Sequence, residues 1–154
     1  MRFPKVSGAN LLRQKKHLPE DFEGLMNVVL IAFWQSQQSD VDTWLPPLER
    51  WEKTCPGLEH YELPTISSRG RLAQFWIDEG MRMGIPDPQT RAHTITLYLE
   101  KAAFRRALEI ESEDEITVLL LDGQGEVIWR GRGVWDADQG QALQSQIEAG
   151  CARL

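Results

Sequence analysis

The sequence predicts a three-layer α/β domain in which helices flank a mixed central sheet. Residues 28–34 and 116–121 are apolar runs without polar alternation, which is typical of strands buried on both faces. Stretches with apolar residues at helical spacing alternate with these strands along the chain. A length of 154 residues fits one domain. We therefore expect residues 1–154 to form a single domain, with residues 1–24 as an N-terminal hairpin or extension.

The composition limits the classes of function. The formal net charge is −6, which offers no electrostatic ground for binding nucleic acid or a membrane surface. The longest apolar run, residues 28–34, is far too short to span a bilayer, so stable membrane insertion is not expected. The first residues, Met-Arg-Phe-Pro-Lys, contain no apolar signal region. They predict a cytoplasmic location unless a leader or anchor has been removed.

The chain is expected to open with a short strand or hairpin at residues 6–12, followed by a basic loop at residues 13–17. A single turn at residues 19–24 ends in glycine and leads into the buried strand 28–34. This strand would lie in the centre of the sheet, because both of its faces are apolar.

A helix should leave the carboxyl end of that strand. Ser39 or Asp40 is a suitable N-cap for it, and apolar residues recur at helical spacing as far as Trp51. Pro46 and Pro47 interrupt this stretch, and proline removes a backbone donor inside a helix. The pattern therefore predicts one helix that bends at the two prolines.

The second half of the chain repeats the alternation. The expected elements are a strand at 58–66, a helix at 67–83, a strand at 94–99, a helix at 101–108, strands at 116–121 and 126–130, and a helix at 138–151. Pro86 and Pro88 would end the helix at 67–83. Asp122 to Gly125 forms a turn, so the strands on either side of it should pair as an antiparallel hairpin.

The residue types that usually carry chemistry are sparse. Cys55 and Cys151 stand 96 positions apart, without the spacing of a metal or redox site, and are interpreted as incidental thiols. His60 and His93 show no close acidic or cysteine partner in the sequence, so no metal is expected, and no cofactor either. The acidic run 109–115 has the composition of a solvated loop.

Several motifs resemble those of bacterial thioredoxin-like proteins that carry an N-terminal hairpin. In that family an apolar strand ends in Phe-Trp, as residues 28–34 do here. A Cys-x-x-Cys motif follows at five and eight residues past the Phe, and a proline at thirteen. Counting from Phe33 places Gln38 and Val41 at the cysteine positions and Pro46 at the proline position. The resemblance implies a thioredoxin-like fold in which both active-site cysteines are missing.

The carboxyl-terminal part of the chain agrees with this resemblance. Residues 116–130 are similar to the family's strand after a cis-proline, its turn and its following strand, and Ile116 occupies the cis-proline position. A peptide bond before isoleucine is almost never cis. Thiol–disulfide exchange needs a thiolate, which neither the amide of Gln38 nor the side chain of Val41 supplies. The resemblance therefore implies that the redox activity is lost and that the protein is not an oxidoreductase.

A second resemblance points to an assembly role. Residues 80–85, Phe104 with Leu108, and residues 121–130 are similar to the mitochondrial assembly factors for the membrane sector of ATP synthase. Those proteins are thought to share a thioredoxin-like core without active cysteines. This resemblance implies an assembly or chaperone-like function.

Two hypotheses of function remain open. In the first, the former active-site groove binds a protein or peptide partner. The candidate binding residues are Trp34, Gln37, Gln38, Ser39, Asp40 and Ile116. Trp34 is an aromatic residue beside a polar loop, and either packing or partner binding explains it. In the second, a non-thiol enzyme or small-molecule carrier uses Asp40, Asp42 and the acidic run 109–115, which would border the groove in this fold. The partner and the oligomeric state are not predicted.

Overall fold

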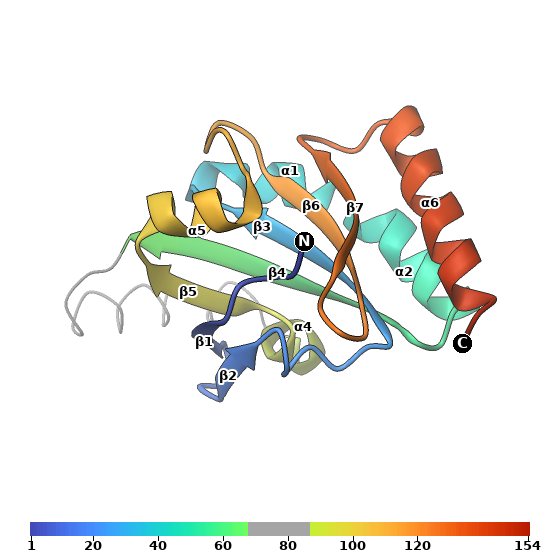
Figure 1. Cartoon of the computed structure of the whole chain (residues 1–154), viewed down its shortest axis with the longest axis horizontal. Helices are drawn as coiled ribbons and strands as arrows, with labels where there is room; N and C mark the ends of the chain where they lie inside the picture. Colours follow the sequence, from blue (N-terminus) through green and yellow to red (C-terminus); the bar gives the residue numbers. More distant parts are fainter. Residues whose placement is uncertain (68–86) are drawn as a thin grey trace.

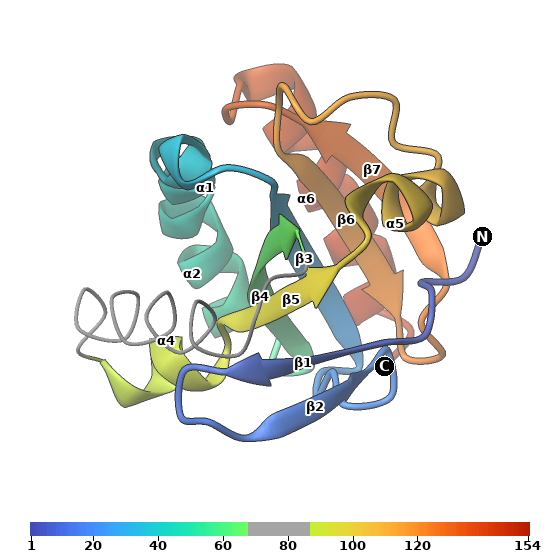
Figure 2. The same ribbon diagram turned by 90° about the vertical axis from the view of Figure 1, so that its left-hand side faces the viewer.

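The computed structural model describes residues 1–67 and 87–154, which form a seven-stranded mixed sheet with helices on both faces (Figures 1 and 2). The strands are β1 Val6–Asn10, β2 Lys15–Leu18, β3 Met26–Ala32, β4 Leu58–Ser67, β5 Ile95–Leu99, β6 Thr117–Asp122 and β7 Val127–Arg132. The helices are η1 Gln35–Gln37, α1 Gln38–Asp42, α2 Leu45–Thr54, α4 Pro88–Ala92, α5 Lys101–Leu108 and α6 Ala137–Cys151. The strand order across the sheet is β2-β1-β5-β4-β3-β6-β7.

Strand β3 lies inside the sheet, as its apolar run predicts. It pairs in parallel with β4 and antiparallel with β6, and its residues Val28 to Ile31 are inaccessible to solvent. Strand β7 pairs antiparallel with β6. The carboxyl ends of β3, β4 and β7 therefore share one edge with the amino end of β6. We call this the upper edge.

Apolar side chains fill both faces of the sheet. On one face Phe3, Phe22 and Phe104 of α5 pack together over the strands. On the other face the sheet packs against Trp44 and Leu48, near and within α2, and against Leu143 and Ile147 of α6. Each buried strand residue thus contacts a helix layer or the N-terminal segment, which explains why the central strands carry no polar face.

The helix after β3 differs from the expected single bent helix. It forms two segments, α1 and α2, and the break falls at Thr43 and Trp44, before the prolines. Pro46 and Pro47 lie in the first turn of α2, where a missing N–H costs nothing. In a continuous helix the ring of Pro46 would clash with the carbonyl of Asp42, so the first segment ends there.

The N-cap prediction was also wrong. Gln37, in place of Ser39 or Asp40, precedes the first residue of α1, and no side chain caps the helix. The short η1 turn continues directly into α1, so the polar residues that suit a cap lie within the helix itself.

The N-terminal hairpin is longer than expected. Residues 15–17, predicted as part of a basic loop, form strand β2 together with Leu18, and this strand pairs antiparallel with β1. Lys15 lies opposite Ala9 and Leu18 opposite Val6. Lysine side chains are common on an edge strand, where they face water and discourage pairing with another chain.

Helix α4 was not predicted. The Asp87 side chain accepts a hydrogen bond from the backbone N–H of Thr90 at 2.8 Å, and Pro88 occupies the first turn. An N-cap aspartate followed by proline is a recognised start signal, so the sequence carried this information. Residues 68–83 of the helix expected at 67–83, and the segment 80–85 of the second resemblance, lie outside the described residues.

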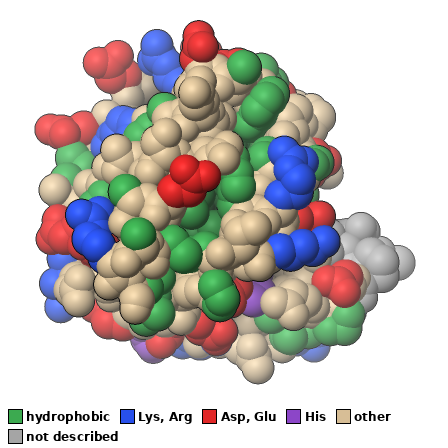
Figure 3. Space-filling view, turned by 90° about the vertical axis from the view of Figure 1, so that its right-hand side faces the viewer, with side chains coloured by type: hydrophobic (Ala, Val, Ile, Leu, Met, Phe, Trp, Pro, Cys, Tyr) green, Lys and Arg blue, Asp and Glu red, His purple; other side chains and the backbone are tan. Residues whose placement is uncertain are grey.

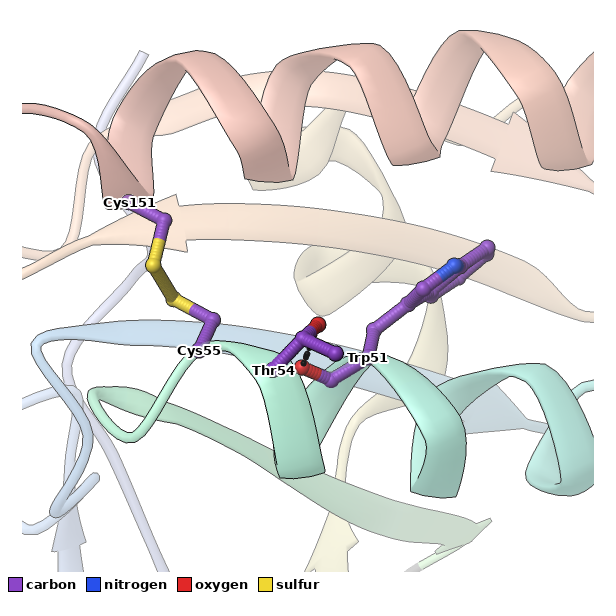
Figure 4. Close-up of a disulfide and its surroundings, with 4 residues drawn as sticks. All are labelled: Trp51, Thr54, Cys55 and Cys151. Carbon is purple, nitrogen blue, oxygen red and sulfur yellow. Dashed lines mark hydrogen bonds between the residues drawn. A yellow bond between two sulfur atoms is a disulfide. The ribbon is translucent and has the colours of Figure 1, made fainter.

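The two cysteines form a disulfide bond, so the prediction of incidental thiols was wrong. Cys55 directly follows α2, Cys151 ends α6, and their Cα atoms are 5.9 Å apart (Figure 4). The separation of 96 residues along the chain does not measure distance in space, because α2 and α6 cover the same face of the sheet.

Candidate functional site

The residues proposed as a binding site gather at the upper edge of the sheet. Trp34 follows β3, and Gln37, Gln38 and Ser39 belong to the η1 and α1 turns that come next. Ile116 directly precedes β6 at the same edge. The sheet topology therefore brings the predicted group together, although its members differ in exposure.

Gln37 lies inside the protein and ties two segments together. Its side chain is 5% exposed, and Oε1 accepts hydrogen bonds from the backbone N–H groups of Phe33, at 2.8 Å, and Trp34, at 3.3 Å. Its Nε2 donates to the carbonyl of Glu113 at 2.6 Å. Gln37 thus holds the end of β3 against the acidic run 109–115. Both polar atoms of its amide are hydrogen-bonded within the protein.

Lys101, the first residue of α5, supports the same two segments. Its buried Nζ donates to the Phe33 carbonyl at 2.8 Å and lies 3.5 Å from Oε1 of Glu113. The ammonium is also 3.8 Å from the centroid of the Trp34 ring, which is a cation–π distance. The Trp34 side chain remains 55% exposed. One face of this indole is therefore fixed by the protein while much of it faces solvent.

Gln38, at the first cysteine position of the resemblance, holds a buried carboxyl group. Its Nε2 donates to Asp42 at 3.0 Å and to Oε1 of Glu62, on β4, at 2.9 Å. Burial raises the pKa of Glu62, against the opposing effects of the Gln38 hydrogen bond and of the His60 charge. Val41, at the second cysteine position, is buried in the core. Neither position carries a thiol.

His60 lies on the same face of β4 and has an acidic partner, contrary to the sequence interpretation. Its Nδ1 is hydrogen-bonded to Oε1 of Glu52 on α2. Burial by itself would lower the pKa of His60, but the hydrogen bond and charge of Glu52, with the charges of Glu62 and Glu49, outweigh it and raise that pKa. In the described ranges, no group of three or more His, Cys, Asp and Glu side chains is arranged to hold a metal ion.

The other predicted residues divide into exposed and buried members. Ser39 is exposed and Asp40 is half-buried. Ile116 is fully buried, and its carbonyl accepts a hydrogen bond from the backbone N–H of Gly133 at 3.0 Å. Gln38, Ser39 and Asp40 are therefore accessible to solvent, whereas Ile116 is covered and anchors a loop.

That loop, residues 133–135 after β7, completes the edge. The Trp44 indole N–H donates to the Gly133 carbonyl at 2.9 Å, and the backbone N–H of Trp135 donates to Oγ1 of Thr43 at 2.9 Å. Both bonds fix the loop to the α1–α2 junction and leave Trp135 exposed. A hollow of about 690 Å³ lies between the acidic run 109–115 and the end of β7.

Sequence reasoning missed Lys101 and Glu62, and it named Glu113 only as part of the acidic run 109–115. All three side chains position the exposed residues. Their contacts join segments separated by 12 to 76 residues along the chain, as the Lys101–Glu113 and Gln37–Glu113 pairs show. The alternation in strand β4 gave one signal, because Glu62 falls on a face that should be covered.

Known structures share this fold. The thioredoxin domain of a thiol-disulfide oxidoreductase from Bacteroides vulgatus matches with a TM-score of 0.62 and 15% identity, over 96% of each chain. A thiol-disulfide oxidoreductase from Bacteroides fragilis matches with a TM-score of 0.60 and 12% identity, over 95% of this chain and 99% of that one. An exposed lipoprotein thioredoxin from Streptococcus pneumoniae matches with a TM-score of 0.57 and 14% identity, over 95% and 99%.

This protein has a thioredoxin-like fold. The expected fold class is therefore confirmed. No family model and no curated protein matches the sequence. The similar structures are redox proteins, whereas the thioredoxin-like fold of this chain holds its two cysteines in a Cys55–Cys151 bond in place of a Cys-x-x-Cys pair. None of the described helices is both long and apolar enough to cross a membrane.

Replacing Lys101 by Met should loosen the Trp34 edge. The variant leaves the buried Phe33 carbonyl without its donor and removes the ammonium from the indole. We expect a loss of about 1–3 kcal/mol in the free energy of unfolding, measured by urea denaturation. The tryptophan fluorescence emission spectrum of the native state should shift as well, because the surroundings of the Trp34 indole change. Lys53→Met, on the exposed side of α2, is the matched control. Equal losses in the two variants would contradict a special role for Lys101.

Replacing Glu52 by Gln should lower the pKa of His60, as measured by NMR titration of the imidazole. In the wild type the raised pKa means that stabilisation by protonated His60 is complete below the unfolded value of 6.5. It is lost as the pH rises through the folded-state value. The difference in the free energy of unfolding between wild type and Glu52→Gln should therefore shrink as the pH rises from 6.5 through the folded-state pKa of His60. Glu49→Gln, which removes only a charge, should lower the pKa less. Equal shifts would argue against the Glu52 hydrogen bond.

Proposed function

We propose that this protein is a redox-inactive thioredoxin-like protein that binds a protein or peptide partner through the upper edge of its sheet. The cysteine positions of the fold carry Gln38 and Val41, which supports the loss of thiol chemistry. The weaker resemblance to ATP synthase assembly factors supports a chaperone-like or assembly role for this binding.

The observation that carries the proposal is the presentation of Trp34. Its indole is 55% exposed, yet one face lies against the buried ammonium of Lys101. Large exposed apolar side chains on rigid supports are common anchors of protein interfaces, because little side-chain freedom is lost on binding. Gln37 and Ile116 support this edge from below, so their contribution to binding is indirect.

The polar surroundings indicate which partner would fit. Gln38 and Ser39 are exposed beside Trp34 and offer hydrogen-bonding groups to a peptide backbone. Glu111, Asp114 and Glu115 of the acidic run are also exposed, and they line the hollow of about 690 Å³. Arg130 and Arg132 line the same hollow, and Arg132 lies 3.7 Å from Glu115. A peptide with an apolar side chain near a lysine or arginine would therefore complement the part of this edge that carries Glu111 and Asp114.

A non-thiol enzyme or small-molecule carrier is the alternative. The observation that favours it is Glu62, whose pKa is raised by burial and whose carboxyl group contacts Gln38 at 2.9 Å. A buried carboxyl group with a raised pKa is a candidate general acid. A small ligand that protects Glu62 or His60 from titration, without any protein partner, would favour this alternative.

Loss of redox activity can be measured directly. The purified protein should neither reduce insulin in the presence of dithiothreitol nor consume peroxide, because no thiolate lies at the amino end of α1. A Cys55→Ser/Cys151→Ser variant is the control for activity from the remaining cysteines. Turnover that persists in this variant would overturn the proposed loss of activity.

Partner binding is tested by affinity capture with a variant of the edge. Trp34→Ala/Gln38→Ala should lose the proteins that the wild type retains, as measured by quantitative mass spectrometry. Leu25→Ala/Gln124→Ala changes the same kinds of exposed residue at the opposite edge of the sheet and should retain them. If both double variants capture the same proteins as the wild type, partners do not bind at the Trp34 edge.

A further inference from the structure

The disulfide lies in a groove between α2 and α6. Figure 3 shows that face of the molecule, with apolar side chains along the hollow, and Figure 4 shows the bond joining the carboxyl ends of the two helices. The groove has a volume of about 470 Å³. It is lined by Arg50, Trp51, Thr54, Gln144, Ile147 and Glu148, together with both cysteines.

The two cysteine residues differ in exposure. Cys55 is 2% exposed and packs within the core beneath α2, whereas Cys151 is half-buried at the margin of that core. Thiol–disulfide exchange requires the attacking thiolate to reach a sulfur atom directly. An external thiol can therefore reach Cys151 more readily than Cys55.

The position at helix carboxyl ends opposes thiolate formation. Cys55 follows the last turn of α2, and Cys151 is the last residue of α6. The partial negative charge at a helix carboxyl end disfavours an anion, whereas a reactive Cys-x-x-Cys thiolate is stabilised at a helix amino end. Both reduced thiols would thus react slowly, which suits a structural bond and does not suit catalytic turnover.

We propose that the Cys55–Cys151 disulfide is a structural bond that forms and opens through Cys151, by exchange with a disulfide-bearing oxidant. The Cys151 thiolate attacks one sulfur of that oxidant and displaces a thiolate, which takes up a proton. The Cys55 thiolate then attacks Sγ of Cys151 and displaces the second oxidant thiolate. Two protein thiols are oxidised, one external disulfide is reduced to two thiols, and the proton count is unchanged.

The bond also indicates where the protein matures. Compartments outside the reducing cytosol supply disulfide-bearing oxidants, whereas cytosolic thiols are kept reduced. The inferred compartment is therefore an oxidising one, in contrast to the cytoplasmic location that the N-terminal residues predict. This inference does not depend on partner binding at Trp34. The affinity-capture experiment at the upper edge therefore tests a separate proposal.

The route through Cys151 is tested on the oxidised wild-type protein. The protein is incubated with reduced glutathione, quenched with acid, alkylated, and mapped by peptide mass spectrometry. We expect the glutathione adduct on Cys151 to exceed that on Cys55 by about tenfold or more in the folded protein. In guanidinium chloride, where both sulfurs are accessible, the two adducts should be comparable. Equal adducts in the folded protein, or an excess on Cys55, would overturn the proposal.

The compartment is tested in the cells that produce the protein. Cells are quenched with acid and treated with a polyethylene-glycol maleimide before and after reduction, and the full chain is followed on a gel. The chain should gain no label before reduction and two labels after it. The Cys151→Ser variant, with one thiol, marks the position of a singly labelled chain. Two labels before reduction would overturn the inference of an oxidising compartment.

Discussion

The buried ammonium of Lys101 is the interaction on which the candidate site depends. It donates a hydrogen bond to the Phe33 carbonyl just after β3, lies against the Trp34 ring and approaches Glu113. A buried cation is unfavourable unless partners of this kind surround it, so the ammonium constrains all of them at once. The side-chain amide of Gln37 links the same strand end to the same acidic run, because it bonds the Phe33 N–H and the Glu113 carbonyl. The position of Trp34 follows from both ties.

The residues at the cysteine positions of the resemblance make structural contacts. Val41 packs in the core, and Gln38 bonds a carboxyl group that the sheet has removed from water. Without the amide, Glu62 would keep the cost of burial and lose its donor. The edge that carries thiols in similar folds is here a set of satisfied polar contacts around one exposed indole.

The two cysteines of this chain both lie at helix carboxyl ends. A thiolate at the start of α1 would be stabilised by the positive helix end, but Cys55 and Cys151 lie at negative ends. Their bond lines the groove between α2 and α6, where the two helices do not fill the space between them. The same fold thus accommodates a structural disulfide because its location reverses the electrostatics that favour exchange.

The sequence alone predicted the main layers and shows that the chain has no Cys-x-x-Cys pair. Strand β3 is continuously apolar because both its faces are covered. Counting from Phe33 to Pro46, as the resemblance suggests, places Gln38 and Val41 at the cysteine positions. Both patterns are local, so the chain shows them without its fold. Burial of Glu62, the ammonium of Lys101 against Trp34, and the Cys55–Cys151 bond were decided only by the tertiary structure. Each is a contact between elements distant in sequence, and the approach of two polar or sulfur atoms depends on how the layers pack, for which no local periodicity exists.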